Sequence, residues 1–178
     1  GAALPERDIS DAKFLRRIVF CCTCVGFHFG VWACRPVAPL AEFHGYKMKV
    51  RVLGCSGGIG GRDQRTTALL VDHDILIDAG TGVGDLEYDE LLRIDHVFVT
   101  HAHLDHIAMI PLLVDTVGEA RSMPIVVHGS PETLRILRSH IFNWLVWPDF
   151  SSIPDRHNPF LRFQEMRVDE TAKLGGGR

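Results

Sequence analysis

The sequence has little cysteine in its main part, and it lacks long apolar runs. Of the five cysteines in this 178-residue chain, only Cys55 lies beyond residue 34. A disulfide framework therefore cannot hold the region from Met48 onward. The apolar run from Ile18 to Ala33 is interrupted by Thr23 and His28, which makes it too short for a membrane span.

The sequence also has no excess of either charge, no internal repeat and no low-complexity tract. Its net charge of -3 comes from acidic and basic residues mixed along the chain. This balance argues against a general nucleic-acid-binding surface, so no nucleic-acid partner is expected. Hydrophobic residues make up 46% of the chain, enough for the core of one ordinary domain at most.

Two regions are expected, a leader or extension at 1–47 and a domain at 48–178. Basic residues before the apolar run, with Cys34 just after it, are typical of a secretory or lipoprotein signal. Alternatively Met48, which precedes a strand pattern, is the true start, or the first region is an ordinary extension. A start at Met48 predicts a cytoplasmic protein, whereas a signal at 16–34 predicts a periplasmic or secreted one. Because the chain begins at Gly1 and stops just after three glycines, we expect a fragment.

The stretch from Asp95 to Val117 carries the chemistry. Its centre has four polar residues in the pattern H-x-H-x-D-H, between a short β-branched run and apolar residues at helical spacing. They are His101, His103, Asp105 and His106. The pattern therefore places these side chains where a buried strand passes into a helix over 104–117.

Imidazole and carboxylate groups together suit a borderline cation such as zinc, manganese or iron. In an extended segment, residues i and i+2 point to the same side, so His101 and His103 can bind one ion. Where the chain turns into the helix, Asp105 and His106 can reach a second position beside it. A histidine-rich surface turn is the alternative. His128, at the end of a later strand, is a candidate for an additional ligand.

The other segments predict an α/β protein. Strands are expected at 50–53, 67–71, 75–77, 97–100, 123–127 and 160–168. A short helix or a turn is expected at 86–92, and a helix at 132–142 with Ser130 as N-cap. Five glycines between Gly54 and Gly61 indicate a tight turn. A nucleotide-binding loop is the alternative there, but neither G-x-G-x-x-G nor a Gly-Lys-Ser/Thr sequence is present.

The segment from Thr100 to His106 resembles the signature of the metallo-β-lactamase-fold hydrolases. This resemblance implies an αβ/βα sandwich, of which only the N-terminal half is present. It also implies that Asp78, in the sequence Asp-Ala-Gly after a strand, supports the ligand loop by hydrogen bonds. An aspartate in an ordinary strand-end turn is the alternative.

Within that superfamily the chain resembles class II 3′,5′-cyclic-nucleotide phosphodiesterases. The resemblance runs from about Met48 to Phe150 and departs from the class signature at Met109 and Pro111. It lies in segments 53–58, 77–82, 101–107, 140–143 and 147–150. An aromatic corner packed after a helix is the alternative interpretation of the last two.

The resemblance implies two divalent metal ions, zinc first among them, with His101 and His103 on one and Asp105 and His106 on the other. A metal-bound hydroxide, oriented or deprotonated by Asp105, would then convert a cyclic nucleotide into a nucleoside 5′-monophosphate. Zinc takes about four ligands, so more residues are needed, and we expect them beyond residue 178. The alternatives are an RNA-processing, lactone or thioester hydrolase of the same fold, and an inactive fragment. Metal identity, substrate-binding residues and oligomeric state stay open.

Overall fold

The structure is a computed structural model that describes residues 7–8, 48–60, 64–167 and 169–174. The chain divides into two compact units, Gly1–Arg51 and Val52–Arg178. In the first unit, β1 (Arg7–Asp8) pairs antiparallel with the start of β2 (Lys49–Gly54). The expected signal segment at 16–34 lies outside the described residues and stays a prediction.

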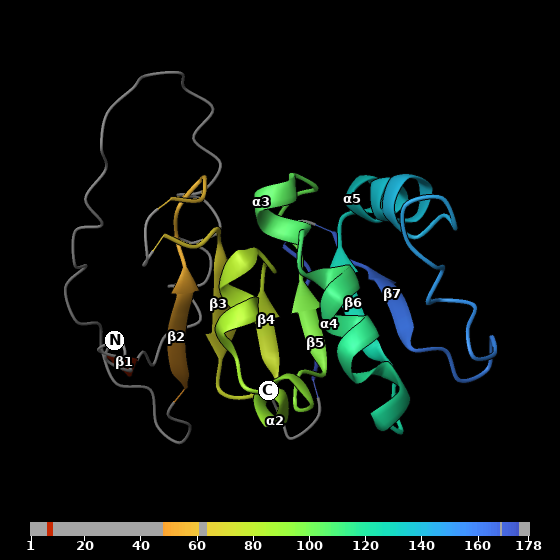
Figure 1. Ribbon diagram of the computed structural model, residues 1–178, viewed down its shortest axis with the longest axis horizontal. Coiled ribbons are helices and arrows are strands. Elements are labelled where there is room, and N and C mark those ends of the chain that lie inside the picture. Colours follow the sequence, from red (N-terminus) through yellow and green to blue (C-terminus); the bar gives the residue numbers. More distant parts are fainter. Residues whose placement is uncertain (1–6, 9–47, 61–63, 168, 175–178) are drawn as a thin grey trace. The chain divides into compact units, whose positions relative to one another are not determined.

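The sheet of the second unit follows the order of the chain (Figure 1). After the end of β2 come β3 (Ala68–Val71), β4 (Ile75–Ile77), β5 (His96–Phe98), β6 (Ile125–Gly129) and β7 (Leu161–Glu165). Strands β3 and β4 are antiparallel, whereas β4 to β7 are parallel, with Ile77 opposite Phe98 and Phe98 opposite His128. The segments that follow β4, β5 and β6 therefore meet at one edge of the sheet.

The helices connect the parallel strands and are short. They are η1 (Thr81–Asp85), α2 (Tyr88–Leu91), α3 (Leu104–Ile107), α4 (Ile110–Val117), η2 (Gly118–Ala120), α5 (Pro131–Ile136) and η3 (Leu137–Ile141). Figure 1 shows α4 in front of the sheet at β6, and α3 and α5 at the end where β5 and β6 finish. None of the helices in the described part is long and apolar enough to cross a membrane.

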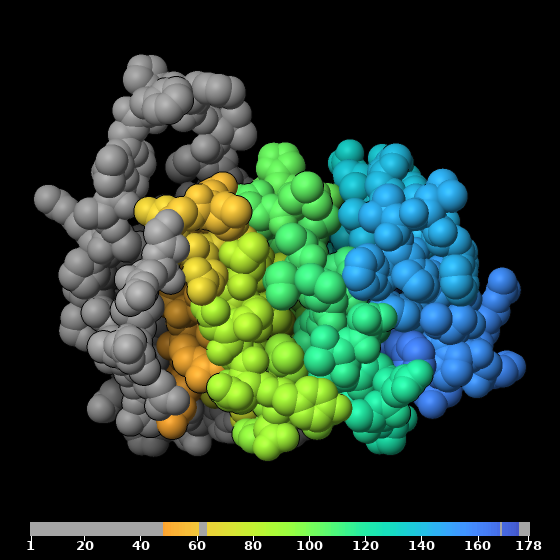
Figure 2. All heavy atoms as spheres, in the orientation of Figure 1, coloured from red at the N-terminus to blue at the C-terminus, as the bar shows by residue number. Residues whose placement is uncertain are grey.

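The core lies between these helices and one face of the sheet. Alternate strand residues such as Leu76, Val97 and Val127 point to this face and are fully buried. Helix α4 adds Ile110 and Val114, which lie four residues apart on one side of the helix and are also fully buried. Figure 2 shows the helices and their connecting segments as a continuous surface over this face.

The predicted helix over 104–117 is two helices, because a turn at Ala108 and Met109 interrupts the helical hydrogen bonds between Ile107 and Ile110. There the backbone N–H of Met109 donates to the carbonyl of Ala79 at 2.9 Å, a tertiary contact that no periodicity shows. The second predicted helix begins as expected, with the Ser130 hydroxyl accepting from the N–H of Thr133 at 3.1 Å. It changes into a π-helical turn at Leu137–Ile141.

His128 lies on the opposite face of the sheet and is only 5% exposed. Its ring stacks on Phe98 with centroids 4.3 Å apart, and its Nε2 lies 3.0 Å from Nδ1 of His96. Burial, together with the nearby His96, lowers the pKa of His128 to about 4. Among the described residues, its Nδ1 has no hydrogen-bond partner. A neutral His128 is thus part of the native packing.

We expect His128 to make the fold sensitive to acid. Its pKa in the folded chain, about 4, lies below the 6.5 of a free histidine, so protonation favours the unfolded state. The stabilisation is therefore present above pH 6.5 and is lost as the pH falls toward 4. In urea unfolding, a change from pH 7.5 to 5 should destabilise the wild type by about 1–2 kcal/mol more than His128→Gln. Equal losses in both chains would contradict this assignment.

Candidate functional site

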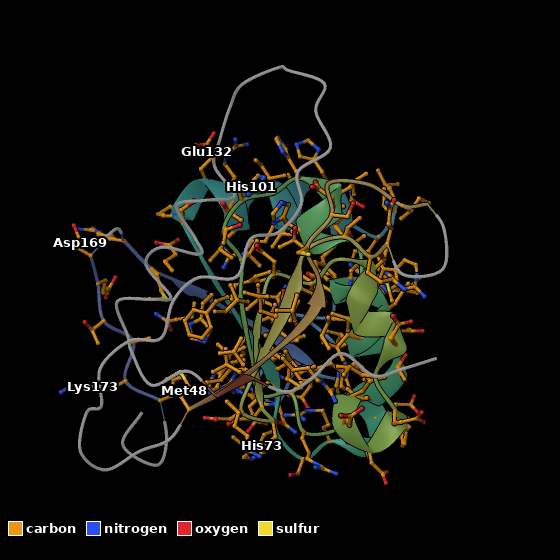
Figure 3. The ribbon with its side chains drawn as sticks, turned by 90° about the vertical axis from the view of Figure 1, so that its left-hand side faces the viewer. Met48, His73, His101, Glu132, Asp169 and Lys173 are labelled. Atoms are coloured by element: carbon orange, nitrogen blue, oxygen red, sulfur yellow. The ribbon has the colours of Figure 1, made fainter. Side chains whose placement is uncertain are left out.

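The predicted site residues gather at the edge of the sheet where the parallel strands end. Asp78 follows β4 directly, and Thr100 and His101 follow β5 after one further residue. Figure 3 labels His101 at this end, where α3 and α5 begin, and His73 at the opposite end. The parallel register thus joins segments that lie more than twenty residues apart in the sequence.

Backbone hydrogen bonds connect the segment after β4 to the segment after β5. The N–H of Asp78 donates to the carbonyl of Phe98 at 2.8 Å, and the N–H of Ala79 donates to the carbonyl of His106 at 2.6 Å. Gly80 allows the close approach, because a Cβ at this position would lie 2.4 Å from the carbonyl oxygen of Asp105. Any larger residue at position 80 would push the two segments apart.

Asp78 lies at the centre of the site and is only 1% exposed. Its φ of 57° is left-handed, a conformation that aspartate tolerates better than most residues. The carboxylate accepts from the backbone N–H of Thr100 at 2.8 Å and from the Thr100 hydroxyl at 2.8 and 3.0 Å. Nδ1 of His106 lies 2.7 Å from the same carboxylate. The buried charge is therefore met by donors from the motif itself.

The motif side chains form two pairs. Nε2 of His101 lies 3.1 Å from Nδ1 of His103, and Nε2 of His106 lies 3.3 Å from a carboxylate oxygen of Asp105. The rings of His101 and His106 also touch, with centroids 4.0 Å apart. His106 is buried, His101 and Asp105 are half-buried, and His103 is exposed. The structure thus brings all four predicted ligands together at one end of the sheet.

The chemistry of this donor set fits a divalent metal ion. Two ligands on a tetrahedral zinc ion, each about 2.0–2.1 Å from it, lie about 3.3 Å apart. The nitrogen pair and the nitrogen–oxygen pair have separations of 3.1 and 3.3 Å. No group of three or more histidine, cysteine, aspartate or glutamate side chains in the described ranges is arranged to hold an ion. The pairs therefore supply donors for an ion without completing its coordination.

The pKa values of His101 and His106 are shifted in opposite directions. Burial lowers the pKa of His101, and the nearby His106 and His103 lower it further. Burial also lowers the pKa of His106, but the hydrogen bond and the charge of Asp78 outweigh it, so the pKa is raised overall. His101 thus keeps a lone pair at neutral pH, which a metal ligand requires.

Other candidates from the sequence have different surroundings. His128 packs against His96 and Phe98, and whether it binds metal stays a prediction. The glycine-rich segment borders a hollow of about 540 Å³ lined by Ile59, Gly60, Gln64, Arg65 and Thr81. The guanidinium of Arg65 pairs with Asp85 at 2.8 Å across this region. The alternative of a nucleotide-binding loop includes residues 61–63, which lie outside the described residues, so it stays a hypothesis.

The aromatic segment after η3 has a packed part and an exposed part. Phe142 and Phe150 are buried with ring centroids 6.2 Å apart, and Trp147 packs against the core. Trp144 is 62% exposed and Leu145 is 90% exposed. The predicted packing of an aromatic corner after the helix is therefore confirmed for the buried aromatic residues of this segment.

Sequence reasoning gave no separate role to Thr100, which the structure places between Asp78 and two histidines. Its hydroxyl lies 3.1 Å from Nδ1 of His101 and 3.5 Å from Nδ1 of His106. A β-branched residue at a strand end is the only signal in the sequence, and such a residue is ordinary in a strand. Only contacts between separate strands show the role of its hydroxyl.

Comparisons with known proteins identify the fold. A solved structure of unliganded yeast PDE1 matches 72% of this chain and 53% of its own, with a TM-score of 0.59 and 19% identity. The metallo-β-lactamase-fold protein YhfI from Bacillus subtilis matches 72% of this chain and 50% of its own, with a TM-score of 0.52 and 22% identity. The chain therefore has the metallo-β-lactamase fold, as the sequence predicted.

The particular family is indicated over part of the chain. The family model described as class II cAMP phosphodiesterases matches residues 88–175. Ribonuclease Z from Halorubrum lacusprofundi is 35% identical over 92 residues, which are 48% of this chain and 30% of that protein. A probable 3′,5′-cyclic-nucleotide phosphodiesterase from Yersinia pestis is 34% identical over 83 residues, 46% of this chain and 23% of that protein. The chain is thus related to hydrolases of this fold and matches about a third or less of each curated relative.

We expect Asp78→Asn to destabilise the metal-free chain by about 1.5–3 kcal/mol, because one neutral amide oxygen accepts poorly from the three donors that meet the carboxylate. Asparagine also tolerates the left-handed backbone, so the loss reports the carboxylate and not strain. Asp85→Asn is the matched control, since its ion pair with Arg65 is exposed and its loss costs less than about 1 kcal/mol. Urea unfolding at pH 7 measures both. Equal effects of the two substitutions would show that Asp78 does not anchor the site.

Proposed function

We propose that this chain carries the metal-binding motif of a phosphodiesterase that converts a 3′,5′-cyclic nucleotide into a nucleoside 5′-monophosphate. The observation that supports this substrate most is the class II cAMP phosphodiesterase match at residues 88–175. That range contains the whole H-x-H-x-D-H motif and the aromatic segment after η3. The fold alone would be compatible with several other hydrolytic reactions.

In this proposal the two side-chain pairs hold two divalent ions, with zinc first among them. Nε2 of His101 and Nδ1 of His103 face one another and would hold one ion, while Asp105 and Nε2 of His106 would hold the second. When bound, such ions lower the pKa of water and neutralise the charge of a phosphate group. An acidic chain can therefore accept an anionic substrate.

Asp105 has the best position for moving a proton. Its carboxylate is half-buried, stands at the start of α3 and approaches His106 at 3.3 Å. We assign to it the orientation of the attacking water and the acceptance of its proton. Nδ1 of His106 lies 2.7 Å from Asp78, which fixes the ring that faces Asp105.

Ribonuclease Z activity is the second candidate, because relatives named ribonuclease Z match this chain as well as the phosphodiesterases do. One from Bradyrhizobium diazoefficiens is 38% identical over 96 residues, which are 48% of this chain and 31% of that protein. Both reactions cleave a phosphodiester, so the same side chains would serve either. The substrates differ in size, from a single nucleotide to a folded RNA.

The substrate class is tested on the gene product that contains this chain. We expect hydrolysis of cyclic AMP to 5′-AMP, and a loss of at least about tenfold in kcat/KM for His103→Ala because one donor is removed. His157→Ala is the matched control, since this exposed histidine lies in a loop away from the motif, and it should leave the rate unchanged. Cleavage of RNA without hydrolysis of cyclic AMP would contradict the proposal and support the ribonuclease.

We expect this 178-residue chain to bind fewer than two zinc ions and to turn over little cyclic AMP. The motif offers four donor side chains, whereas zinc takes about four ligands for each ion. Elemental analysis after dialysis against metal-free buffer measures the stoichiometry. Two tightly held zinc ions per chain would show that the donor count is wrong.

A further inference from the structure

We propose that the Thr100 hydroxyl is a positioning group that connects Asp78 to His101 and selects the nitrogen that His101 offers to a metal. The inference rests on the proposed function, because it concerns the same metal-binding pair. It adds a residue that is not a predicted ligand but whose hydroxyl contacts the predicted ligand His101. The role follows from the directions of the hydrogen bonds at a single oxygen atom.

The Thr100 hydroxyl has one proton, and it donates this proton in a hydrogen bond to Asp78. The two oxygens of the carboxylate lie 3.0 and 2.8 Å from Oγ1, and a carboxylate can only accept. Of the two other contacts of Oγ1, Nδ1 of His106 at 3.5 Å already donates to Asp78, and the shorter one, to Nδ1 of His101 at 3.1 Å, must use a lone pair of the hydroxyl. Nδ1 of His101 is then the donor and carries the proton.

A neutral imidazole has one N–H and one lone pair. With the proton on Nδ1, the lone pair of His101 is on Nε2, the atom that faces Nδ1 of His103 at 3.1 Å. Thr100 thus leaves the correct nitrogen free for an ion.

The same carboxylate fixes the second histidine without an intermediate group. Nδ1 of His106 lies 2.7 Å from Asp78, so it donates there, and its Nε2 faces Asp105. Asp78 therefore orients one ligand of each pair, His106 directly and His101 through Thr100. The backbone N–H of Thr100, which also donates to Asp78 at 2.8 Å, holds the hydroxyl in register.

A purely structural role for Thr100 predicts a different result, so the test needs a readout of the tautomer. Thr100→Val removes the hydroxyl and keeps the shape of the side chain, whereas Thr100→Ser keeps the hydroxyl. Long-range ¹H–¹⁵N spectra of the metal-free chain at pH 7 report which nitrogen of His101 is protonated. We expect Nδ1–H in the wild type and in Thr100→Ser, and a mixture of tautomers in Thr100→Val.

Zinc affinity gives the second readout, by competition with a chromophoric chelator. We expect Thr100→Val to bind zinc about 10–100-fold more weakly than the wild type, as is common when a group that orients a ligand is removed, and Thr100→Ser to stay within about threefold. Thr116→Val is the matched control, because the Thr116 hydroxyl donates only to its own helix at Leu112. It should change nothing.

The wild-type spectrum keeps the proposal falsifiable even if Thr100→Val does not fold. Nε2–H on wild-type His101 would overturn it, as would a folded Thr100→Val with unchanged tautomer and zinc affinity. A wild-type chain that binds no zinc but carries Nδ1–H on His101 would refute the metal-binding function while leaving the relay from Asp78 intact. The two failures are therefore distinguishable.

Discussion

A buried carboxylate must be matched by hydrogen-bond donors, and the site depends on how Asp78 meets this requirement. At 1% exposure it has almost no access to solvent. Its donors come from Thr100 and His106, so the charge is compensated only when the end of β5 and the start of α3 lie against the end of β4. Burial of the Asp78 charge therefore requires the conformation that the motif adopts.

The metallo-β-lactamase fold supplies this constraint through its parallel strands. Because β4 and β5 run in the same direction with Ile77 opposite Phe98, the residues after each strand meet without any long connection. Gly80 allows the segments after β4 and β5 to lie in contact. The carbonyl of Ala79 accepts a hydrogen bond from the N–H of Met109, and this bond replaces a helical one between α3 and α4. The histidines therefore lie on a turn between rigid elements, an arrangement that keeps ligands in place.

Much of this arrangement could be predicted from the sequence. The pattern of His101, His103, Asp105 and His106 follows from the geometry of an extended segment that enters a helix, and the structure brings these side chains together. Their metal-binding roles stay predictions. The role of Asp78 required the family resemblance, because an aspartate after a strand is common in turns.

The remaining features depend on contacts between distant segments. The interruption between α3 and α4 arises from the hydrogen bond to Ala79, and the π-helical turn at Leu137–Ile141 has no signature in apolar spacing. Thr100 resembles any β-branched strand residue until its hydroxyl is placed beside Asp78. Local sequence patterns predict single helices and strands, whereas these features depend on contacts between two segments that are distant in the sequence.

The curated relatives are named for two different activities, ribonuclease Z and cyclic-nucleotide phosphodiesterase. The class II cAMP phosphodiesterase model matches residues 88–175, and the ribonuclease Z relative from Halorubrum lacusprofundi matches 48% of the chain. The two curated relatives named first are matched over 30% and 23% of their own length. The hydrogen-bond network at Asp78 belongs to this chain whichever of the two activities is correct.

The most direct test of this account is anomalous diffraction at the zinc absorption edge from crystals of the chain grown with zinc. The account predicts an anomalous peak about 2.0–2.1 Å from both Nε2 of His101 and Nδ1 of His103, with Nδ1 of His106 still bonded to Asp78. A peak on Nδ1 of His101, or zinc bound only elsewhere on the chain, would contradict it.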